Sequence, residues 1–429
     1  MGYRACLDDL YALQRFGIKL GLENTTRLLE RLGSPQDGLR IVHIAGTNGK
    51  GSTAAALTSV LRQADLRVGL YTSPHLHDFT ERIQIDGRPV PQQEVVDIMT
   101  EVRPLCAELN VTFFEATTAL ALCAFRRAGV EWVVLEVGMG GRLDATNVVT
   151  PELAVITPIS FDHAEHLGFS LAEIAQEKAG IIKPEVPVLS AYQDPKAAAV
   201  LSAQAEQRHA PIAFAGTDFR CRPAAGESFD YCGLDRTLVG LRAGLPGSHQ
   251  IDNMGLALAA AELLMRQGVV IPEQALRDGV ENTRWPGRLE WIEQRNRRFL
   301  LDGAHNPAGA EVLATYLAGC DPARIHWVVG CKADKNFTGI FDPLLPLMTR
   351  VYACHPPVES ATEPNLLCAY ANQQGVGADV YDHATDAITA AVAAAADNDV
   401  ILVAGSLFLV AEARALLFGN TPDSPRGTQ

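Results

Sequence analysis

Short apolar runs rich in β-branched residues recur along the chain and alternate with segments of helical length. Runs of this kind predict strands that are buried on both faces of a sheet. Because strands and helices alternate, the pattern predicts a mainly parallel sheet with helices on both sides. The strands predicted in this way are Ile41–Ala45, Trp132–Val137, Leu153–Thr157 and Val186–Leu189, and the helices include Ser52–Ala64 and Thr117–Ala128.

Residues 210–247 depart from this pattern, because many Gly, Pro and Asp residues and short alternating runs predict irregular or antiparallel structure. A helix over His249–Gln267 follows. The α/β rhythm then returns and predicts a second, smaller Rossmann-like domain, with elements at Phe299–Leu301, Ile325–Val329, Val351–Cys354, Asp386–Ala396 and Val400–Ala404. We expect the domain boundary near Glu293–Arg298, which gives domains 1–295 and 296–429 with residues 420–429 as a disordered tail.

The composition narrows the class of protein. A chain of 429 residues exceeds one average domain and fits two. The formal net charge of −14 argues against nucleic acid as the main partner, because phosphate backbones are bound by clustered Lys and Arg. The nine cysteines form no C-x-x-C pair, so neither a disulfide framework nor a zinc site is predicted. Free thiols and the lack of any long apolar run favour a cytoplasmic protein with neither signal peptide nor membrane span.

The strongest chemical signal is the segment His43–Ser52, with the sequence HIAGTNGKGS, between a predicted strand and a predicted helix. In this setting Gly46 and Gly49 allow backbone N–H groups to turn inward and hold phosphates. Lys50 adds a positive charge for the β and γ phosphates, and Ser52 is placed to cap the helix or to bind magnesium. The segment departs from the common P-loop by one replaced and one inserted position (Ile44 and Gly51), and the alternative is an ordinary glycine-rich turn.

Four polar groups stand near the ends of predicted strands or helices, and ligands in open parallel sheets bind beyond strand ends. Glu136 ends an apolar strand, where a buried carboxylate is costly unless it binds a cation. Ser73 and His163 can each complete a magnesium shell. Lys178 can take up carbon dioxide as a carbamate and become an oxygen ligand. A Ser-Pro turn, a structural histidine and a salt-bridge lysine remain the alternatives for Ser73, His163 and Lys178.

Six segments, in order and spread over both predicted domains, together resemble the bacterial folylpolyglutamate synthases, including the form that is also a dihydrofolate synthase. They are His43–Ser52, Ser73–Leu76 with Glu81–Ile83, Glu136–Asn147, Asp162-His163 with Leu167-Gly168, Glu177–Ile181, and Asp302–Pro307. This family is related to the Mur ligases. The resemblance implies an α/β protein, with a P-loop ATPase domain built on a mainly parallel sheet and a smaller C-terminal Rossmann-like α/β domain.

The resemblance also implies residue roles. ATP would be held by Thr47, Asn48, Gly49, Lys50, Gly51, Ser52, Asn253, Arg288 and Asp302. Two magnesium ions would be bound by Ser73, Glu136 and His163, with help from a carbamylated Lys178. Lys50, Lys178 and His305 are predicted to be catalytic, although His305 is equally explained by the helix start at Asn306-Pro307. The pteroate group would contact Lys19-Leu20-Gly21, Thr112-Phe113-Phe114-Glu115 and Leu143-Asp144-Ala145.

The implied activity is ATP-dependent addition of L-glutamate to dihydropteroate, which makes dihydrofolate, and to the γ-carboxylate of tetrahydrofolates and their polyglutamates. The carboxylate would be activated as an acyl phosphate, and the enzyme would act as a monomer on small molecules. The bifunctional pattern has Asp at the position of Lys19, so the dihydropteroate reaction stays open. Asp334-Lys335-Asn336 also departs from the usual Asp-Lys-Asp, so the role of that loop stays open as well. The alternatives are a Mur-type ligase for a UDP-sugar peptide, a simple kinase or GTPase, and a nucleotide-binding module without catalysis.

Overall fold

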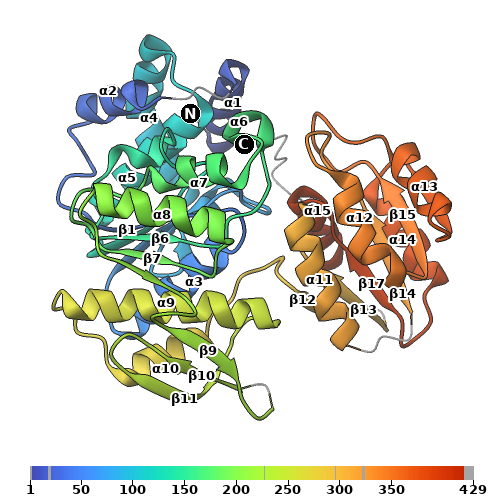
Figure 1. Ribbon diagram of the computed structural model, residues 1–429. Helices are drawn as coiled ribbons and strands as arrows, with labels where there is room; N and C mark the ends of the chain where they lie inside the picture. Colours follow the sequence, from blue (N-terminus) through green and yellow to red (C-terminus); the bar gives the residue numbers. More distant parts are fainter. Residues whose placement is uncertain (1, 18–20, 227, 295, 321–323, 420–429) are drawn as a thin grey trace.

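The structure is a computed structural model that describes residues 2–17, 21–226, 228–294, 296–320 and 324–419. Lys19, Leu20 and the predicted tail Asn420–Gln429 lie outside the described residues. The chain forms a larger N-terminal domain and a smaller C-terminal domain, each built on its own sheet, as Figure 1 shows. This arrangement confirms the predicted fold class.

The larger sheet has eight strands in the order β4-β3-β2-β5-β1-β6-β7-β8. Six neighbouring strands run parallel, in the order β2-β5-β1-β6-β7-β8. Strands β3 and β4 add an antiparallel edge beside β2. The strands are Arg40–Ala45 (β1), Val68–Tyr71 (β2), Ile83–Ile85 (β3), Arg88–Pro89 (β4), Trp132–Glu136 (β5), Leu153–Ile156 (β6), Val188–Ser190 (β7) and Ile212–Phe214 (β8). The predicted strands lie within one or two residues of these bounds.

Helices cover both faces of this sheet because its strands are apolar on both sides. Along β5, Trp132 and Val134 pack with α3, α9 and α10, whereas Val133 and Leu135 pack with α1, α2, α4 and α5. Helices α7 and α8 cover β6 and β7. The helices are Tyr3–Tyr11 (α1), Glu23–Arg31 (α2), Lys50–Gln63 (α3), Gln92–Leu109 (α4), Phe113–Ala128 (α5), Ala164–Leu167 (α6), Leu171–Ala179 (α7), Pro195–Gln207 (α8), Ser248–Arg266 (α9) and Glu273–Glu281 (α10), with 3-10 turns at Ala12–Phe16, Phe79–Arg82 and Ala145–Val148.

The segment 210–247 contains two kinds of structure. Its first strand, β8, extends the parallel sheet beside β7. The rest forms the predicted antiparallel structure, a three-stranded sheet in the order β11-β10-β9 that packs against α9. These strands are Arg220–Pro223 (β9), Ser228–Cys232 (β10) and Thr237–Arg242 (β11).

The C-terminal domain has a six-stranded sheet in the order β12-β13-β17-β14-β15-β16, in which only β12 is antiparallel. Helices α11, α12 and α13 cover one face, and α14 and α15 cover the other. The strands are Glu290–Gln294 (β12), Arg297–Leu301 (β13), Ile325–Val329 (β14), Arg350–Cys354 (β15), Ala378–Tyr381 (β16) and Val400–Val403 (β17). The helices are Pro307–Gly319 (α11), Phe337–Leu344 (α12), Pro364–Gln373 (α13), Ala384–Ala394 (α14) and Leu407–Phe418 (α15), with a 3-10 turn at Leu345–Leu347.

Two sequence expectations need correction. The polar segment expected at the domain boundary, Glu293–Arg298, lies in the hairpin of β12 and β13, so the C-terminal sheet begins at Glu290, before residue 295. An edge strand carries polar side chains on its open side, which explains its lack of apolar periodicity. The helix expected from Thr117 begins at Phe113, because Thr112 and Glu115 form a capping box.

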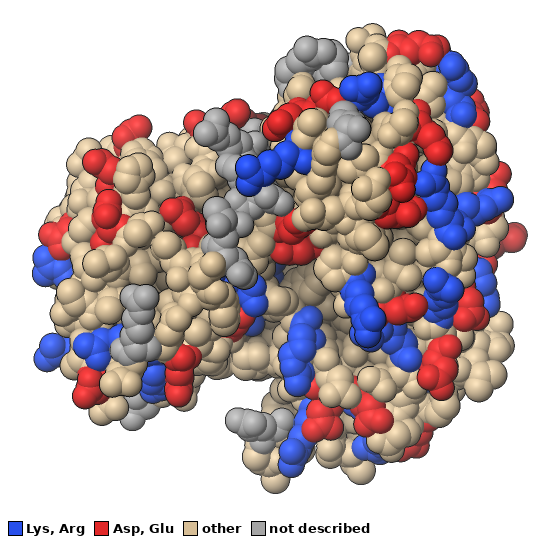
Figure 2. All heavy atoms as spheres, turned by 180° about the vertical axis from the view of Figure 1, so that it is seen from behind, with Lys and Arg blue, Asp and Glu red and all other residues tan. Residues whose placement is uncertain are grey.

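Charged side chains of both signs are interspersed over the face of the molecule shown in Figure 2. None of the helices in the described part of the chain is both long and apolar enough to cross a membrane.

Candidate active site

The candidate site lies where the order of the strands in the larger sheet reverses, on either side of β1. Strand β1 has β5 on one side and β6 on the other, and the loops after these strands leave the same edge of the sheet. Ligands bind at such a topological switch point. The phosphate loop connects β1 to α3, which starts at Lys50, two residues earlier than predicted.

Two glycines allow the phosphate loop to pack against its surroundings. Gly46 has φ +148°, and a Cβ atom there would lie 1.8 Å from Thr157 Oγ1. Gly49 has φ +84°, and a Cβ atom there would lie 2.5 Å from Asn253 Oδ1. Any larger residue at either position would therefore strain the backbone and collide with a neighbour.

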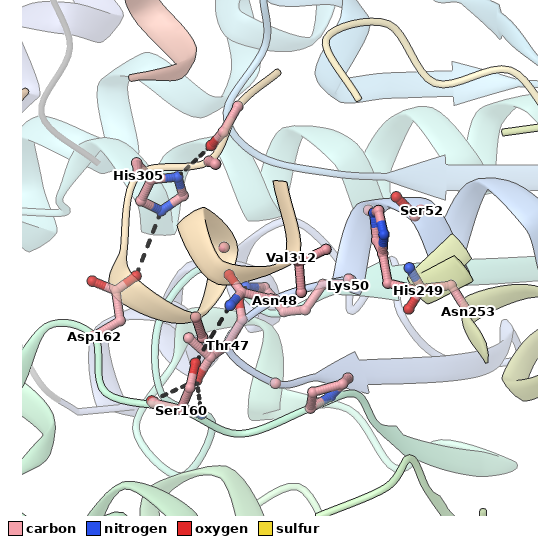
Figure 3. A pocket seen from close by; sticks show the side chains of 18 of the residues that line it. Thr47, Asn48, Lys50, Ser52, Ser160, Asp162, His249, Asn253, His305 and Val312 are labelled. Carbon is pink, nitrogen blue, oxygen red and sulfur yellow. Dashed lines mark hydrogen bonds and ion pairs between the residues drawn. The ribbon is translucent and has the colours of Figure 1, made fainter. Parts of the chain in front are cut away.

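The side chains of the loop make specific contacts, which Figure 3 shows in part. Thr47 Oγ1 donates to the carbonyl of Ser160 at 3.0 Å and accepts the Ser160 N–H at 3.1 Å. Lys50 Nζ donates to the Thr47 carbonyl at 3.2 Å. Asn48 pairs with Asn306 of the C-terminal domain. The Thr47 side chain therefore holds the loop in place, and the loop ends at the N-terminus of α3, where a helix offers free backbone N–H groups to an anion.

A cavity of about 370 Å³ brings together residues from both domains. All predicted nucleotide, metal and catalytic residues line it: Thr47, Asn48, Gly49, Lys50, Gly51, Ser52, Ser73, Glu136, His163, Lys178, Asn253, Arg288, Asp302 and His305. We call it the phosphate cavity. Segments that lie far apart in the sequence thus converge on one cavity.

Glu136, at the end of β5, is only 4% exposed and accepts the Ser73 N–H at 3.2 Å. Burial raises the pKa of Glu136 to about 6, against the opposing charge of Lys50. Among the described residues, no Lys, Arg or His lies within ion-pair distance of this carboxylate. Glu136 is therefore a buried acid with room for a cation.

His163 has a left-handed backbone, with φ 50°. Burial lowers the pKa of His163 to about 4, so its ring is neutral at pH 7. Its Nε2 atom lies 3.4 Å from Lys335 Nζ. A neutral imidazole keeps the lone pair that a metal ligand needs.

Lys178, in α7, is 3% exposed, and its Nζ donates to the Gly46 carbonyl at 2.9 Å. Burial, and then the nearby charge of Lys50, lower the pKa of Lys178 to about 7. A large fraction of this amine is therefore uncharged at neutral pH. The neighbouring Glu177 instead pairs with Arg142 at 2.7 Å, so the salt-bridge alternative for Lys178 lacks support.

The residues that the hinge and the C-terminal domain add to the phosphate cavity are held by hydrogen bonds to backbone groups. Asp302 accepts the N–H groups of Leu289 and Ala304, each at 2.9 Å. Arg288 is half-buried, and desolvation lowers the pKa of its guanidinium. His305 Nδ1 lies 2.7 Å from the Gly303 carbonyl and can donate to it, which leaves Nε2 directed toward Asp162.

Asp162 is a site residue that the sequence reasoning named only as a neighbour of His163. Its side chain is 9% exposed, and it lies 2.6 Å from Lys335 Nζ, 3.1 Å from Asn306 Nδ2 and 3.5 Å from His305 Nε2. Burial opposes ionisation, but His305, His163 and Lys335 together hold the pKa of Asp162 well below its usual range. The position of Asp162 beside the candidate metal ligand His163 is the sequence feature that could have identified it as a site residue. Ser160 and His249, which also line the cavity, carried none.

A second cavity, of about 730 Å³, adjoins the phosphate cavity, and we call it the aromatic cavity. The predicted pteroate contacts that are described all line it: Gly21, Thr112, Phe113, Phe114, Glu115, Leu143, Asp144 and Ala145. Thr112 and Glu115 also cap α5, since Glu115 Oε2 accepts the Thr112 N–H at 2.7 Å. Four residues line both cavities and form their shared wall: Ser73, Gly138, Met139 and His163.

Both domains of the chain match models of known protein families. Residues 44–261 match the Mur ligase middle domain, and residues 287–407 match the Mur ligase glutamate ligase domain. A dihydrofolate synthase/folylpolyglutamate synthase of Bacillus subtilis is 34% identical, over 97% of this chain and 99% of its own length. The chain belongs to the folylpolyglutamate synthase family of Mur ligases.

Solved structures of this family superimpose over nearly the whole chain. The Mycobacterium tuberculosis folylpolyglutamate synthase in complex with ADP is 35% identical, with a TM-score of 0.90 over 97% of this chain and 100% of that one. The E. coli FolC protein in complex with DHPP and ADP is 30% identical, with a TM-score of 0.89 over 96% of this chain and 98% of that one. Two longer haloarchaeal relatives, each named as a probable bifunctional folylpolyglutamate synthase/dihydropteroate synthase, are matched over 50% and 51% of their length, so this chain spans about half of them.

Proposed function

We propose that this protein is an ATP-dependent ligase that adds L-glutamate to dihydropteroate and to the γ-carboxylate of tetrahydrofolates. The observation that carries the proposal is the shared wall of the two cavities. A flat ring system in the aromatic cavity would direct its carboxylate toward Ser73 and His163, beside the phosphate loop. Relatives that bind ADP, and in one case DHPP as well, support this assignment of nucleotide and pteridine to the two cavities.

The reaction follows from this placement. An oxygen of the substrate carboxylate attacks the γ-phosphorus of ATP, the bond to the bridging oxygen breaks, and ADP leaves. The amine of glutamate then attacks the acyl carbon, phosphate leaves, and the nitrogen loses a proton. Lys50 and the N–H groups of α3 would neutralise charge on the phosphates, as is typical of phosphoryl transfer. Arg288, Asp302 and His305 come from the hinge and the C-terminal domain, so the complete site requires domain closure.

Three residues that line the phosphate cavity fit magnesium. Glu136 offers a buried carboxylate, His163 a neutral imidazole and Ser73 a hydroxyl oxygen, all of which line the phosphate cavity. Within the described residues no three His, Cys, Asp or Glu side chains gather as a complete metal site, so the remaining ligands would come from phosphates or a carbamate. Magnesium, when bound, supplies charge neutralisation to the phosphate oxygens.

Lys178 fits the carbamate role because its amine is buried and its pKa is lowered to about 7. The neutral amine attacks carbon dioxide, a C–N bond forms, and one proton is released. The product carries a negative charge that the nearby cation Lys50 would balance. We propose that this carbamate completes the metal site.

A direct assay tests the proposed function. The full-length protein is incubated with ATP, magnesium, L-glutamate and either dihydropteroate or tetrahydrofolate, and phosphate release is measured together with product mass. Phosphate release that requires glutamate, and a product heavier by one glutamate, are expected with both acceptors. Turnover with tetrahydrofolate alone would restrict the enzyme to polyglutamylation, and no glutamate-dependent release with either acceptor would refute the proposal.

We further propose that the enzyme works as a cytoplasmic monomer. The phosphate cavity combines residues from both domains of one chain, which favours a site that is complete within a monomer. The nine cysteines are all free, which fits a reducing compartment.

A further inference from the structure

We propose that Asp162 is a positioning residue that latches the C-terminal domain onto the phosphate loop, through Lys335 and Asn306. The phosphate loop and Asp162 belong to the N-terminal domain, whereas both partners follow strands of the C-terminal sheet. Asn306 stands between β13 and α11, and Lys335 between β14 and α12. Two separate loops therefore converge on one carboxylate.

Both oxygens of Asp162 are used across the domain boundary. Oδ1 accepts from Lys335 Nζ at 2.6 Å, and Oδ2 accepts from Asn306 Nδ2 at 3.1 Å. The Lys335 and Asp162 side chains are only 5% and 9% exposed, so water screens this ion pair weakly. Such a contact differs from surface pairs, which contribute little.

Asn306 connects this ion pair to the phosphate loop. Its Nδ2 donates to Asn48 Oδ1 at 3.0 Å as well as to Asp162, and its Oδ1 accepts Asn48 Nδ2 at 3.1 Å and the Gly309 N–H at 2.9 Å. Both donors and both acceptor positions of this amide are therefore occupied. Because Asn306 also caps α11, the orientation of that helix is tied to the phosphate loop and to Asp162 together.

His305 adds a third contact from the same loop. Its Nε2 lies 3.5 Å from Asp162 Oδ2, while Nδ1 can donate to the Gly303 carbonyl (Figure 3). An imidazole that donates through Nδ1 donates through Nε2 as well only when it is protonated. The contacts of Asp162 with Lys335 and Asn306 do not require a protonated His305, so the latch depends on these two contacts.

Small-angle X-ray scattering tests the latch directly. Wild type, Asp162→Asn and Lys335→Met are compared in EDTA, with and without the non-hydrolysable analogue AMPPCP. EDTA removes divalent ions, so the result does not depend on the candidate metal ligand His163. Both variants should show a larger radius of gyration than wild type. The matched control is Asp379→Asn, which breaks a 2.6 Å ion pair with Arg350 inside the C-terminal domain and should leave the radius unchanged.

A double-mutant cycle measured in kcat/KM distinguishes a positioning role from a purely structural role. This second experiment rests on the proposed function. Each single variant should lower kcat/KM about tenfold, and the double variant should also lose about tenfold instead of a hundredfold, because the two residues form one contact. If wild type shows no glutamate-dependent turnover, the proposed function fails while the scattering result still decides the latch. Scattering curves of both variants that superimpose on wild type would overturn the latch, and if Asp162→Asn does not fold, Lys335→Met decides alone.

Discussion

Two buried carboxylates flank the phosphate loop and have opposite electrostatic environments. Glu136 is the last residue of β5 and Asp162 follows β6, and these strands lie on either side of β1. Burial without an ion pair raises the pKa of Glu136 to about 6, whereas the cations around Asp162 hold its pKa well below the usual range. The first carboxylate therefore has no cation partner among the described residues and fits the proposed magnesium site, while the second is already engaged with the C-terminal domain.

The largest effect is expected from removing Lys50, whose charge counteracts the rise in the pKa of Glu136 more strongly than any other group. Lys50→Ala should lower glutamate-dependent phosphate release by on the order of a thousandfold, because the charge that stabilises the transferred phosphoryl group is lost. The exposed Lys196→Ala is the matched control and should keep wild-type activity. Circular dichroism checks the fold, and a folded Lys50→Ala variant with normal turnover would contradict the assigned role.

Removing the buried amine of Lys178 should have the next largest effect. Lys178→Ala is expected to lower activity by about a hundredfold, with partial recovery in millimolar acetate, which can replace the carbamate. In wild type, carbon-13 NMR with labelled bicarbonate should show a carbamate signal that grows as the pH rises through about 7, since only the neutral amine reacts. Full activity of the variant without acetate would exclude the carbamate.

Neutralising Glu136 and neutralising Asp162 should change the free energy of unfolding in opposite directions when magnesium is absent. The pKa of Glu136 rises on folding from 4.5 to about 6, so its contribution to stability is lost as the pH rises through this range, at a cost of roughly 2 kcal/mol above it. In EDTA at pH 7.5, Glu136→Gln should therefore raise the free energy of unfolding by about that amount. The gain should disappear below pH 4.5, where wild type is neutral in both states.

Asp162→Asn should do the reverse, since its pKa falls on folding and its contribution is present at neutral pH and lost on acidification. Breaking a buried ion pair of this kind costs about 3 kcal/mol. Urea denaturation of the two variants and wild type measures both changes. If both variants shift the unfolding free energy in the same direction, the contrast between the two carboxylates is wrong.

The smallest effect is expected for an ion pair away from the cavities. Asp379 and Arg350 are 41% and 46% exposed, and exposed pairs typically contribute less than about 1 kcal/mol. Asp379→Asn should change kcat/KM by less than a factor of about two. A loss comparable to that of Asp162→Asn would show that ion-pair loss in general, and not the interdomain contact, accounts for the effect at Asp162.

The sequence by itself determined the strands, the phosphate loop and the family, because these depend on local patterns. A buried parallel strand is apolar over its whole length, and a loop that approaches a phosphate needs glycine where Gly46 and Gly49 stand. The start of α5 was predicted too late, at Thr117, because the capping box of Thr112 and Glu115 was not taken into account.

Only the tertiary structure decided what the strand-end carboxylates do. Glu136 and Asp162 are both acids near strand ends, and the sequence does not show which of them a cation reaches. Asp162 acquires its cation from Lys335, which lies 173 positions away along the chain. Electrostatic environment depends on distances in space between groups that folding brings together, and local patterns along the chain carry no information about those distances.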